Sequence, residues 1–286
     1  MAISCQGEGF SFEKTMQGTV KFTGKSVIAS DTNRFYIKLN PVIDPSKPEE
    51  YSFDCPKIVV GNMIIGETYV EPQGPTIVEN HTTGEKCELE FKTRGWTSKN
   101  KDIVTGDVKD VKGKVRYKLE GKYTEKIELI NCETKETEVV WTAPSKPENH
   151  HLMYGFNNYA LQLNLLTDSL KEKLPPTDSR FRMDTRLWES GKQDESTAQK
   201  NRMEVNQRNR KKALKEQLKG KKNMEGDDCE YYTPKYFRKS VHPKTGDTVY
   251  SFIEKNERGS NYWMDRDKQS WSHLPRIFDD DCEPFY

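Results

Sequence analysis

The chain has 286 residues, and its 46 lysines and arginines against 45 aspartates and glutamates give a formal net charge of +1. Apolar residues make up 33% and charged residues 32%, a more polar composition than that of a typical globular domain. Aromatic residues stand at 10%, too many for a disordered chain. These values exclude a disordered chain and predict a folded protein with much solvated surface.

The sequence also excludes a protein with a membrane-spanning helix and a secreted protein. No apolar run approaches the ~18 residues that a bilayer-spanning helix requires, and the N-terminal residues lack a basic segment followed by an apolar one. The 6 cysteines include no C-x-x-C pair, which is typical of reduced thiols rather than of a disulfide or zinc framework. We therefore expect a cytoplasmic protein with no bound metal and no cofactor.

The first half of the chain alternates between apolar and polar residues with a period of two. The pattern is clearest over residues 86–92 and 114–120, and it recurs at 35–39 and 20–22. Such alternation predicts antiparallel strands with one apolar and one solvated face. Turn sequences, for example at 83–85, separate the strands. Many short strands at this spacing favour a barrel or a strongly curled sheet.

No catalytic arrangement accompanies these strands. Gly24-Lys25-Ser26 resembles the end of a phosphate-binding P-loop, but Thr19 stands where that motif needs its first glycine. A hairpin turn is therefore the better interpretation. The pair His150-His151 lies in a stretch typical of a linker and lacks a third ligand at metal-binding spacing. Because no nucleophile–base pattern is present, we expect no catalytic residue and a binding protein rather than an enzyme.

The period changes at about Asn157. Apolar residues between 160 and 170 predict a helix that ends at Pro175-Pro176. A proline-free stretch from Gln193 to Gly220, rich in Lys, Arg, Glu and Gln, predicts a long helix that is mostly exposed. A turn sequence at 243–247 predicts a hairpin in a region rich in aromatic residues.

The long helix carries an unusual positive charge. Ten basic residues against two acidic ones between Gln199 and Lys222 give a local charge of +8, which attracts the phosphates of lipids or nucleic acids. Lys200, Glu204 and Arg208 follow one another at intervals of four residues, about 40° apart, and so share a face. Two cations beside a carboxylate suit a phosphorylated polyol. Ordinary ion pairs on an exposed helix have the same spacing, so spacing alone leaves both interpretations open.

Sequence similarity in the residues before and within this helix favours the binding of a phosphorylated polyol over ordinary ion pairs. Residues 174–187, LPPTDSRFRMDTRL, look like the L-P-P-T-D-S-R-x-R-x-D-x-R stretch of oxysterol-binding-protein-related domains, and the similarity continues through Lys200-x-Arg202-x-Glu204-x-x-Gln207-Arg208. Further similar segments occur at 61–66, 80–87, 233–237 and 275–278. The family's E-Q-x-S-H-H-P-P fingerprint and K-P-x-N-P-x-x-G-E stretch do not occur in this sequence. We therefore expect a fragment or a shortened relative that starts just after the fingerprint.

The resemblance implies a mainly β fold with some α structure. Members of the family form an incomplete antiparallel β-barrel around a tunnel, followed by a helical C-terminal region. On this basis residues 1–142 are expected to form the strands of the partial barrel, or curled sheet. Residues 143–286 are expected to form the helical C-terminal region, with the basic helix and a final aromatic β-hairpin, in the same domain.

The resemblance also implies lipid binding and transfer, with a sterol or glycerophospholipid exchanged for phosphatidylinositol 4-phosphate between membranes. Lys200, Glu204 and Arg208 match the family's Lys, Glu and Arg that contact the inositol phosphate headgroup, and the apolar sheet face would hold the sterol or acyl chains. The expected partners are these lipids and an anionic membrane surface. The expected location is peripheral, on cytoplasmic membrane faces that include endoplasmic reticulum contact sites.

Two alternatives stay open at this point. One is a membrane-contact adaptor or regulatory scaffold that no longer carries lipid. The other is nucleic-acid binding through the basic helix. It is less favoured because the helix has no interleaved aromatic residues and no base-reading module is visible. No nucleic acid partner is therefore expected.

Overall fold

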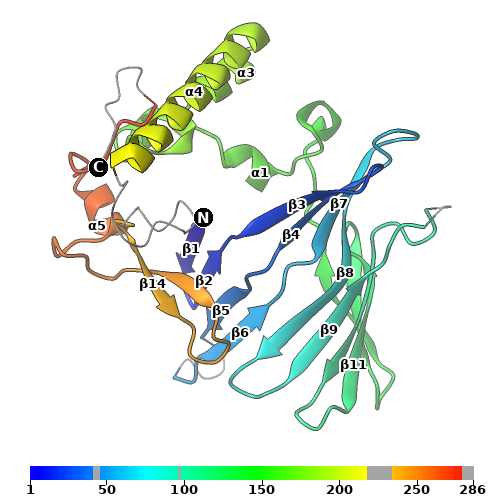
Figure 1. Cartoon of the computed structure of the whole chain (residues 1–286). Coiled ribbons are helices and arrows are strands. Elements are labelled where there is room, and N and C mark those ends of the chain that lie inside the picture. Colours follow the sequence, from blue (N-terminus) through cyan, green and yellow to red (C-terminus); the bar gives the residue numbers. More distant parts are fainter. Residues whose placement is uncertain (41–45, 96–97, 218–233, 279–286) are drawn as a thin grey trace. The chain divides into compact units, whose positions relative to one another are not determined.

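The computed structural model describes residues 1–40, 46–95, 98–217 and 234–278. The chain divides into two compact units (Figure 1). Unit 1 comprises Met1–Pro144 and Phe237–Phe252, and unit 2 comprises Ser145–Tyr236 and Ile253–Tyr286. The final hairpin thus belongs to the unit of the strands, and the grouping of all these parts into one domain stays a prediction.

Unit 1 is built on an antiparallel sheet of 13 strands, which confirms the prediction of a mainly β fold with a curled sheet (Figure 1). The strands of this sheet are β1 (Ala2–Gly7), β2 (Phe10–Thr15), β3 (Gly18–Phe22), β4 (Val27–Asp31), β5 (Phe35–Leu39), β6 (Glu49–Phe53), β7 (Lys57–Gly61), β8 (Tyr69–Asn80), β9 (Lys86–Phe91), β10 (Ile103–Lys109), β11 (Val115–Lys122), β12 (Lys126–Asn131) and β13 (Thr137–Thr142).

The sheet forks at the long strand β8. One edge of β8 pairs with β7 over residues 69–73 and with β6 over residues 78–80, while β9 pairs along its other edge. One branch continues from β6 through β5 and β2 to β1, and the other from β7 through β4 to β3. Among the described residues β1 and β13 do not pair with each other, so the barrel is incomplete, as predicted.

The β3–β4 connection confirms the turn predicted for Gly24-Lys25-Ser26. The backbone N–H of Thr23 donates to the carbonyl oxygen of Ser26 at 2.9 Å, and the two strands pair in register on either side. The segment is therefore a strand–turn–strand unit, without the helix that a P-loop requires.

Strand β5 differs from its predicted pattern. Alternation assigns Phe35 and Ile37 to the buried face, yet Tyr36 is the buried residue, with 7% of its surface exposed. Its ring stacks on His242 at 4.1 Å between centroids, and its hydroxyl donates to Asp247 at 2.5 Å. The cause is a long-range contact, because both partners come from the distant hairpin.

That hairpin, β14 (Phe237–Val241) and β15 (Thr248–Phe252), confirms the prediction around residues 243–247. Side chains of β2 hold its second strand. The carboxylate of Glu13 accepts hydrogen bonds from the backbone N–H of Phe252 at 3.0 Å and from the hydroxyl of Ser251 at 2.9 Å. The hydroxyl of Thr15 accepts one from the N–H of Tyr250 at 2.9 Å.

Unit 2 is helical. Its helices are the 3₁₀ helices η1 (His150–Met153) and η2 (Ser179–Phe181) and the α-helices α1 (Asn158–Gln162), α2 (Asp168–Lys171), α3 (Met183–Glu189), α4 (Gln193–Gln217) and α5 (Tyr262–Asp267). The long helix predicted from Gln193 is confirmed as α4, and its last predicted residues, 218–220, lie outside the described residues. The pair His150-His151, interpreted as linker, lies in η1.

The helix predicted over residues 160–170 is wrong as a single element. Two short helices, α1 and α2, occupy the region. Each begins at its own cap, because the side chain of Asn157 accepts from the N–H of Ala160 and that of Thr167 from the N–H of Leu170. α1 ends at Gln162, and Thr167, with extended dihedral angles, begins the second helix as its N-cap.

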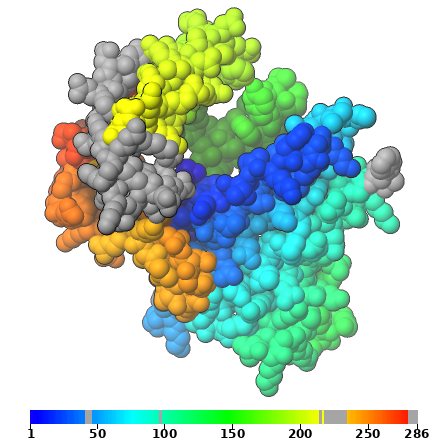
Figure 2. Space-filling model, viewed as in Figure 1, coloured from blue at the N-terminus to red at the C-terminus, as the bar shows by residue number. Residues whose placement is uncertain are grey.

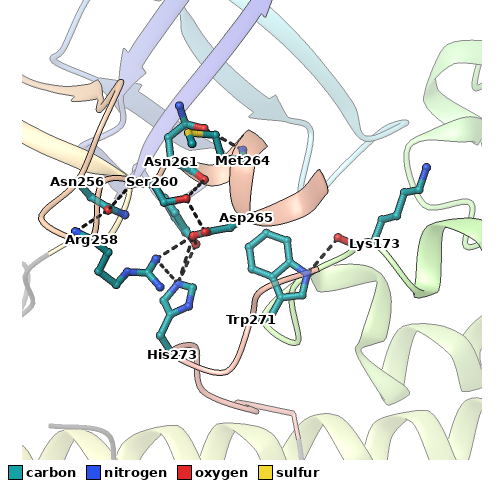
Figure 3. Close-up of polar contacts among 10 residues, drawn as sticks. Lys173, Asn256, Arg258, Ser260, Asn261, Met264, Asp265, Trp271 and His273 are labelled. Carbon is teal, nitrogen blue, oxygen red and sulfur yellow. Dashed lines mark hydrogen bonds and ion pairs between the residues drawn. The ribbon is translucent and has the colours of Figure 1, made fainter. Parts of the chain in front are cut away.

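The C-terminal part of unit 2 is organised around the buried carboxylate of Asp265 (Figure 3). Ser260, Tyr236 and Arg258 donate to it at 2.6, 2.7 and 2.8 Å. Burial raises the pKa of this carboxyl group, but these donors outweigh it and leave the pKa below its ordinary value. The indole of Trp271 also donates to the carbonyl oxygen of Lys173 at 3.1 Å, which ties the C-terminal part to the segment after α2.

Candidate functional site

Helix α4 presents the three predicted headgroup residues on one exposed face. Lys200 and Glu204 form an ion pair at 3.8 Å, with 60% and 47% of their side-chain surfaces exposed. Arg208 is also exposed. Since four residues advance an α-helix by about 40° beyond a full turn, the three side chains form one slowly turning row.

The same row begins at Ser196, where α4 packs on α3. Ser196 is buried, and its hydroxyl donates to the carbonyl oxygen of Asp184 at 2.7 Å. Figure 1 shows the two helices side by side. The short helix α3 therefore covers the first turn of α4 on this side.

Arg182, just before α3, is a cation that the sequence reasoning missed. Its guanidinium binds both carboxylate oxygens of Asp184, at 2.7 and 3.1 Å. This hydrogen bonding raises the pKa of Arg182, and the negative charge of Glu204 adds to the effect. Glu204 is thus bound to Lys200 and lies in the electrostatic field of Arg182. The signal in the sequence was the Arg-x-Asp spacing, but it does not show that this pair faces α4.

The PPTDSR segment, which carries the resemblance, has a structural role. Asp178 caps η2 by accepting from the N–H of Arg180 at 2.9 Å, and its carboxylate also binds the guanidinium of Arg180 twice, at 2.8 Å. Arg186 donates to the carbonyl oxygen of Asn164 at 2.9 Å and pairs with Glu189. These arginines are therefore engaged within unit 2, where they build the turn that leads into α3 and α4.

Unit 1 carries an apolar surface on the branch of β3, β4, β7 and β8. Directly opposed residues of neighbouring strands point to the same side of a sheet, so the register identifies one continuous face. The residues of this face, here called the apolar face, are Val20, Phe22, Val27, Ala29, Ile58, Val60, Val70 and Pro72. Val20 is 74% exposed, and Phe22 and Val70 are each 64% exposed.

The apolar face of a strand is usually buried against a core, whereas this face is exposed. Figure 2 shows the β3–β4 hairpin (blue) open on the visible surface, next to the neighbouring loop in cyan. The sequence predicted the alternation in β3, but the identity of the whole face depends on the pairing of four strands.

Within the described part of the chain, no helix combines the length and the hydropathy that crossing a membrane would require.

Comparison with known proteins shows the relationship directly. The family model described as oxysterol-binding protein matches residues 1–267. Oxysterol-binding protein homolog 1 of Saccharomyces cerevisiae is 30% identical over 281 residues, which cover 90% of this chain and 22% of that protein. By its name, this relative is an oxysterol-binding protein.

Solved structures show the same fold. The Osh1 ORD domain in complex with ergosterol superposes with a TM-score of 0.78 at 24% identity, covering 99% of this chain and 65% of that one. The Osh3 ORD of Saccharomyces cerevisiae in complex with PI(4)P superposes with a TM-score of 0.71 at 26% identity, covering 96% of this chain and 66% of that one. The chain thus spans about two thirds of these domains, and between about a fifth and a half of the curated relatives it matches.

Proposed function

Because the chain belongs to the oxysterol-binding protein family, we propose that it binds a sterol or glycerophospholipid and exchanges it for phosphatidylinositol 4-phosphate between membranes. The observation that carries the proposal is the exposed row of Lys200, Glu204 and Arg208 on α4. The three positions lie within residues 1–267, the range that the family model matches. A similar structure, the Osh3 ORD, is a complex with PI(4)P.

Each member of the row has a chemical task suited to an inositol phosphate. The planar guanidinium of Arg208 donates two parallel hydrogen bonds to a phosphate, which a lysine cannot do. The ammonium of Lys200 supplies a second positive charge, and the carboxylate of Glu204 accepts from ring hydroxyls. Glu204 also forms an ion pair with Lys200 at 3.8 Å.

The apolar face of unit 1 supplies the hydrocarbon contacts in this proposal. A sterol or acyl chain laid on Val20, Phe22 and Val70 removes exposed apolar surface from water on both partners, at about 25 cal/mol per Å². Binding of the lipid therefore resolves the otherwise unfavourable exposure of this face. The protein acts peripherally, on the cytoplasmic faces of anionic membranes, with endoplasmic reticulum contact sites among them.

The test is extraction of phosphatidylinositol 4-phosphate from liposomes by the chain and three variants. Glu204→Ala and Arg208→Glu should each lower extraction by at least about tenfold, since each removes a charge-assisted hydrogen bond to the headgroup. Arg210→Glu is the matched control, because it makes the same charge change about 160° around the helix from Arg208. Equal losses in Arg208→Glu and Arg210→Glu would show a general charge effect and contradict the site.

The same experiment separates lipid carriage from an adaptor role. An adaptor would sediment with the liposomes and leave the lipid in them. A chain that binds the vesicles but extracts neither phosphatidylinositol 4-phosphate nor a fluorescent sterol would therefore refute the transfer proposal and support the adaptor.

A further inference from the structure

Two connections of unit 1 meet at one end of the apolar face. The β3–β4 turn and the β7–β8 loop are joined by a hydrogen bond from the backbone N–H of Met63 to the carbonyl oxygen of Lys25, at 3.4 Å. Residues 22–26 and 61–66 form this end, here called the apolar tip. Strands β4 and β7 pair directly behind it, so the tip rests on a continuous sheet.

The tip exposes large aliphatic side chains from a well-defined turn. Ile64 is 71% exposed and Ile65 is 83% exposed. The loop that carries them is closed by its own polar groups, because the side chain of Asn62 donates to the carbonyl oxygen of Glu67 at 3.1 Å. Gly66 has a φ of +92°, a conformation that glycine adopts without strain. These features define the shape of the loop, and both of its isoleucines are mostly in solvent.

Two lysines lie on or beside the tip. Lys21 and Lys25 are exposed, and residues 18–26 and 61–66 contain no acidic side chain. Glu67, the nearest acid in the sequence, follows the loop; its backbone oxygen closes the loop and its side chain is exposed, so the two lysines outnumber it. Protruding isoleucines flanked by lysines match a bilayer surface, where apolar side chains enter the acyl region and lysines remain among anionic headgroups.

We propose that the apolar tip docks the protein on anionic phospholipid bilayers by inserting Ile64 and Ile65, with Lys21 and Lys25 on the headgroups. The apolar face shares Phe22 with the tip and continues through Val27 and Val60 along the sheet. A docked tip thus places the bilayer's hydrocarbon next to the surface proposed to hold a lipid. Docking itself does not depend on the headgroup row.

The test is flotation of the chain with vesicles of phosphatidylcholine and phosphatidylserine that contain neither sterol nor phosphoinositide. Ile64→Ser with Ile65→Ser should lower the bound fraction by at least about tenfold. Lys21→Glu and Lys25→Glu should each lower it about fivefold or more, and omission of phosphatidylserine should have the same effect. Val111→Ser is the matched control, because Val111 is a similarly exposed aliphatic residue of the β10–β11 turn.

Insertion has a second, independent readout. An Ile65→Trp variant should show fluorescence quenching by bromine-labelled acyl chains that the parent chain does not show. Unchanged flotation of the isoleucine variant, equal losses in Val111→Ser, or no added quenching would each overturn the proposal. So would a concentration-dependent dimer that the isoleucine change abolishes, since the tip would then bind a second copy.

The outcome is distinguishable from a failure of the proposed lipid exchange. Arg208→Glu should float with these vesicles as the parent does, although it no longer extracts phosphatidylinositol 4-phosphate.

Discussion

At the scale of single residues, unit 2 concentrates its buried charge at Asp265. Three side chains donate to one carboxylate with 4% of its side chain exposed. Its loss leaves Ser260 without this acceptor and leaves Arg258 and Tyr236 to share the single Nε2 of His273. We predict that Asp265→Ala lowers the free energy of unfolding by about 3 kcal/mol. Urea denaturation followed by tryptophan fluorescence measures it. Asp267→Ala, an exposed position of the same helix, should change the free energy by less than about 0.5 kcal/mol, and a similar loss there would contradict the assignment.

The neighbouring His273 makes the free energy of unfolding depend on pH. Its Nε2 lies 2.8 Å from the guanidinium of Arg258, which only donates, so this nitrogen accepts and the ring is neutral. Burial lowers the pKa of His273 below its ordinary value of 6.5, and the charge of Arg258 lowers it further, while Asp265 partly opposes this and Lys235 adds to it.

The sign of the dependence follows from the unfolded state, which binds the proton first as the pH falls. The stabilisation is therefore complete above about pH 6.5 and is lost as the pH drops below that value, by at most about 1.4 kcal/mol per pH unit. His273→Gln should reduce this slope between pH 7.5 and 5.5 in urea denaturation. Part of the slope should remain in this variant, because the pKa of His81 is also lowered, chiefly by burial. A slope unchanged in His273→Gln would exclude the residue as its source.

At the scale of elements, β15 depends on side chains of β2 for its attachment. Glu13 accepts from both Ser251 and the backbone N–H of Phe252. We predict that Glu13→Ala accelerates hydrogen exchange of the Phe252 amide by about tenfold, because a partly buried donor loses its acceptor. The amide of Ser240, which lies on the other strand of the hairpin, should change less. Uniform acceleration throughout unit 1 would instead mean global destabilisation.

The elements also show which structural features could be predicted from sequence patterns. The alternation in β9, the long helix α4 and the β14–β15 turn depend on neighbouring residues, and the structure confirms all three. The burial of Tyr36 was not predictable, because its partners His242 and Asp247 lie about 200 residues along the chain. The break before Thr167 was predictable in principle, since threonine is a common N-cap.

The candidate site also combines features that local sequence predicts with features that only the fold reveals. The row of Lys200, Glu204 and Arg208 needs only a regular helix, so its spacing was readable from the sequence. The proximity of Arg182 to Glu204 needs the packing of α3 on α4, which no local pattern encodes. The apolar face needs the register of four strands, which becomes known only with the fold.

At the scale of the whole molecule, the proposed exchange assigns different lipids to different side chains. A sterol has a hydroxyl but no phosphate, so it needs the apolar face and not Arg208. Phosphatidylinositol 4-phosphate has acyl chains as well as a charged headgroup, so in the proposed exchange its chains need an apolar surface and its headgroup needs the row. A carboxylate introduced on the apolar face places an uncompensated charge against hydrocarbon, which penalises either lipid.

We therefore predict that Ala29→Glu lowers extraction of both sterol and phosphatidylinositol 4-phosphate by at least about tenfold. Arg208→Glu should lower only the phosphoinositide. Parallel extraction from liposomes that contain one lipid each measures the two effects, and Ser30→Glu, on the opposite side of β4, controls for the added charge. If Arg208→Glu reduced sterol extraction as strongly as phosphoinositide extraction, the two lipids would share the headgroup row, and the division of labour proposed here would be wrong.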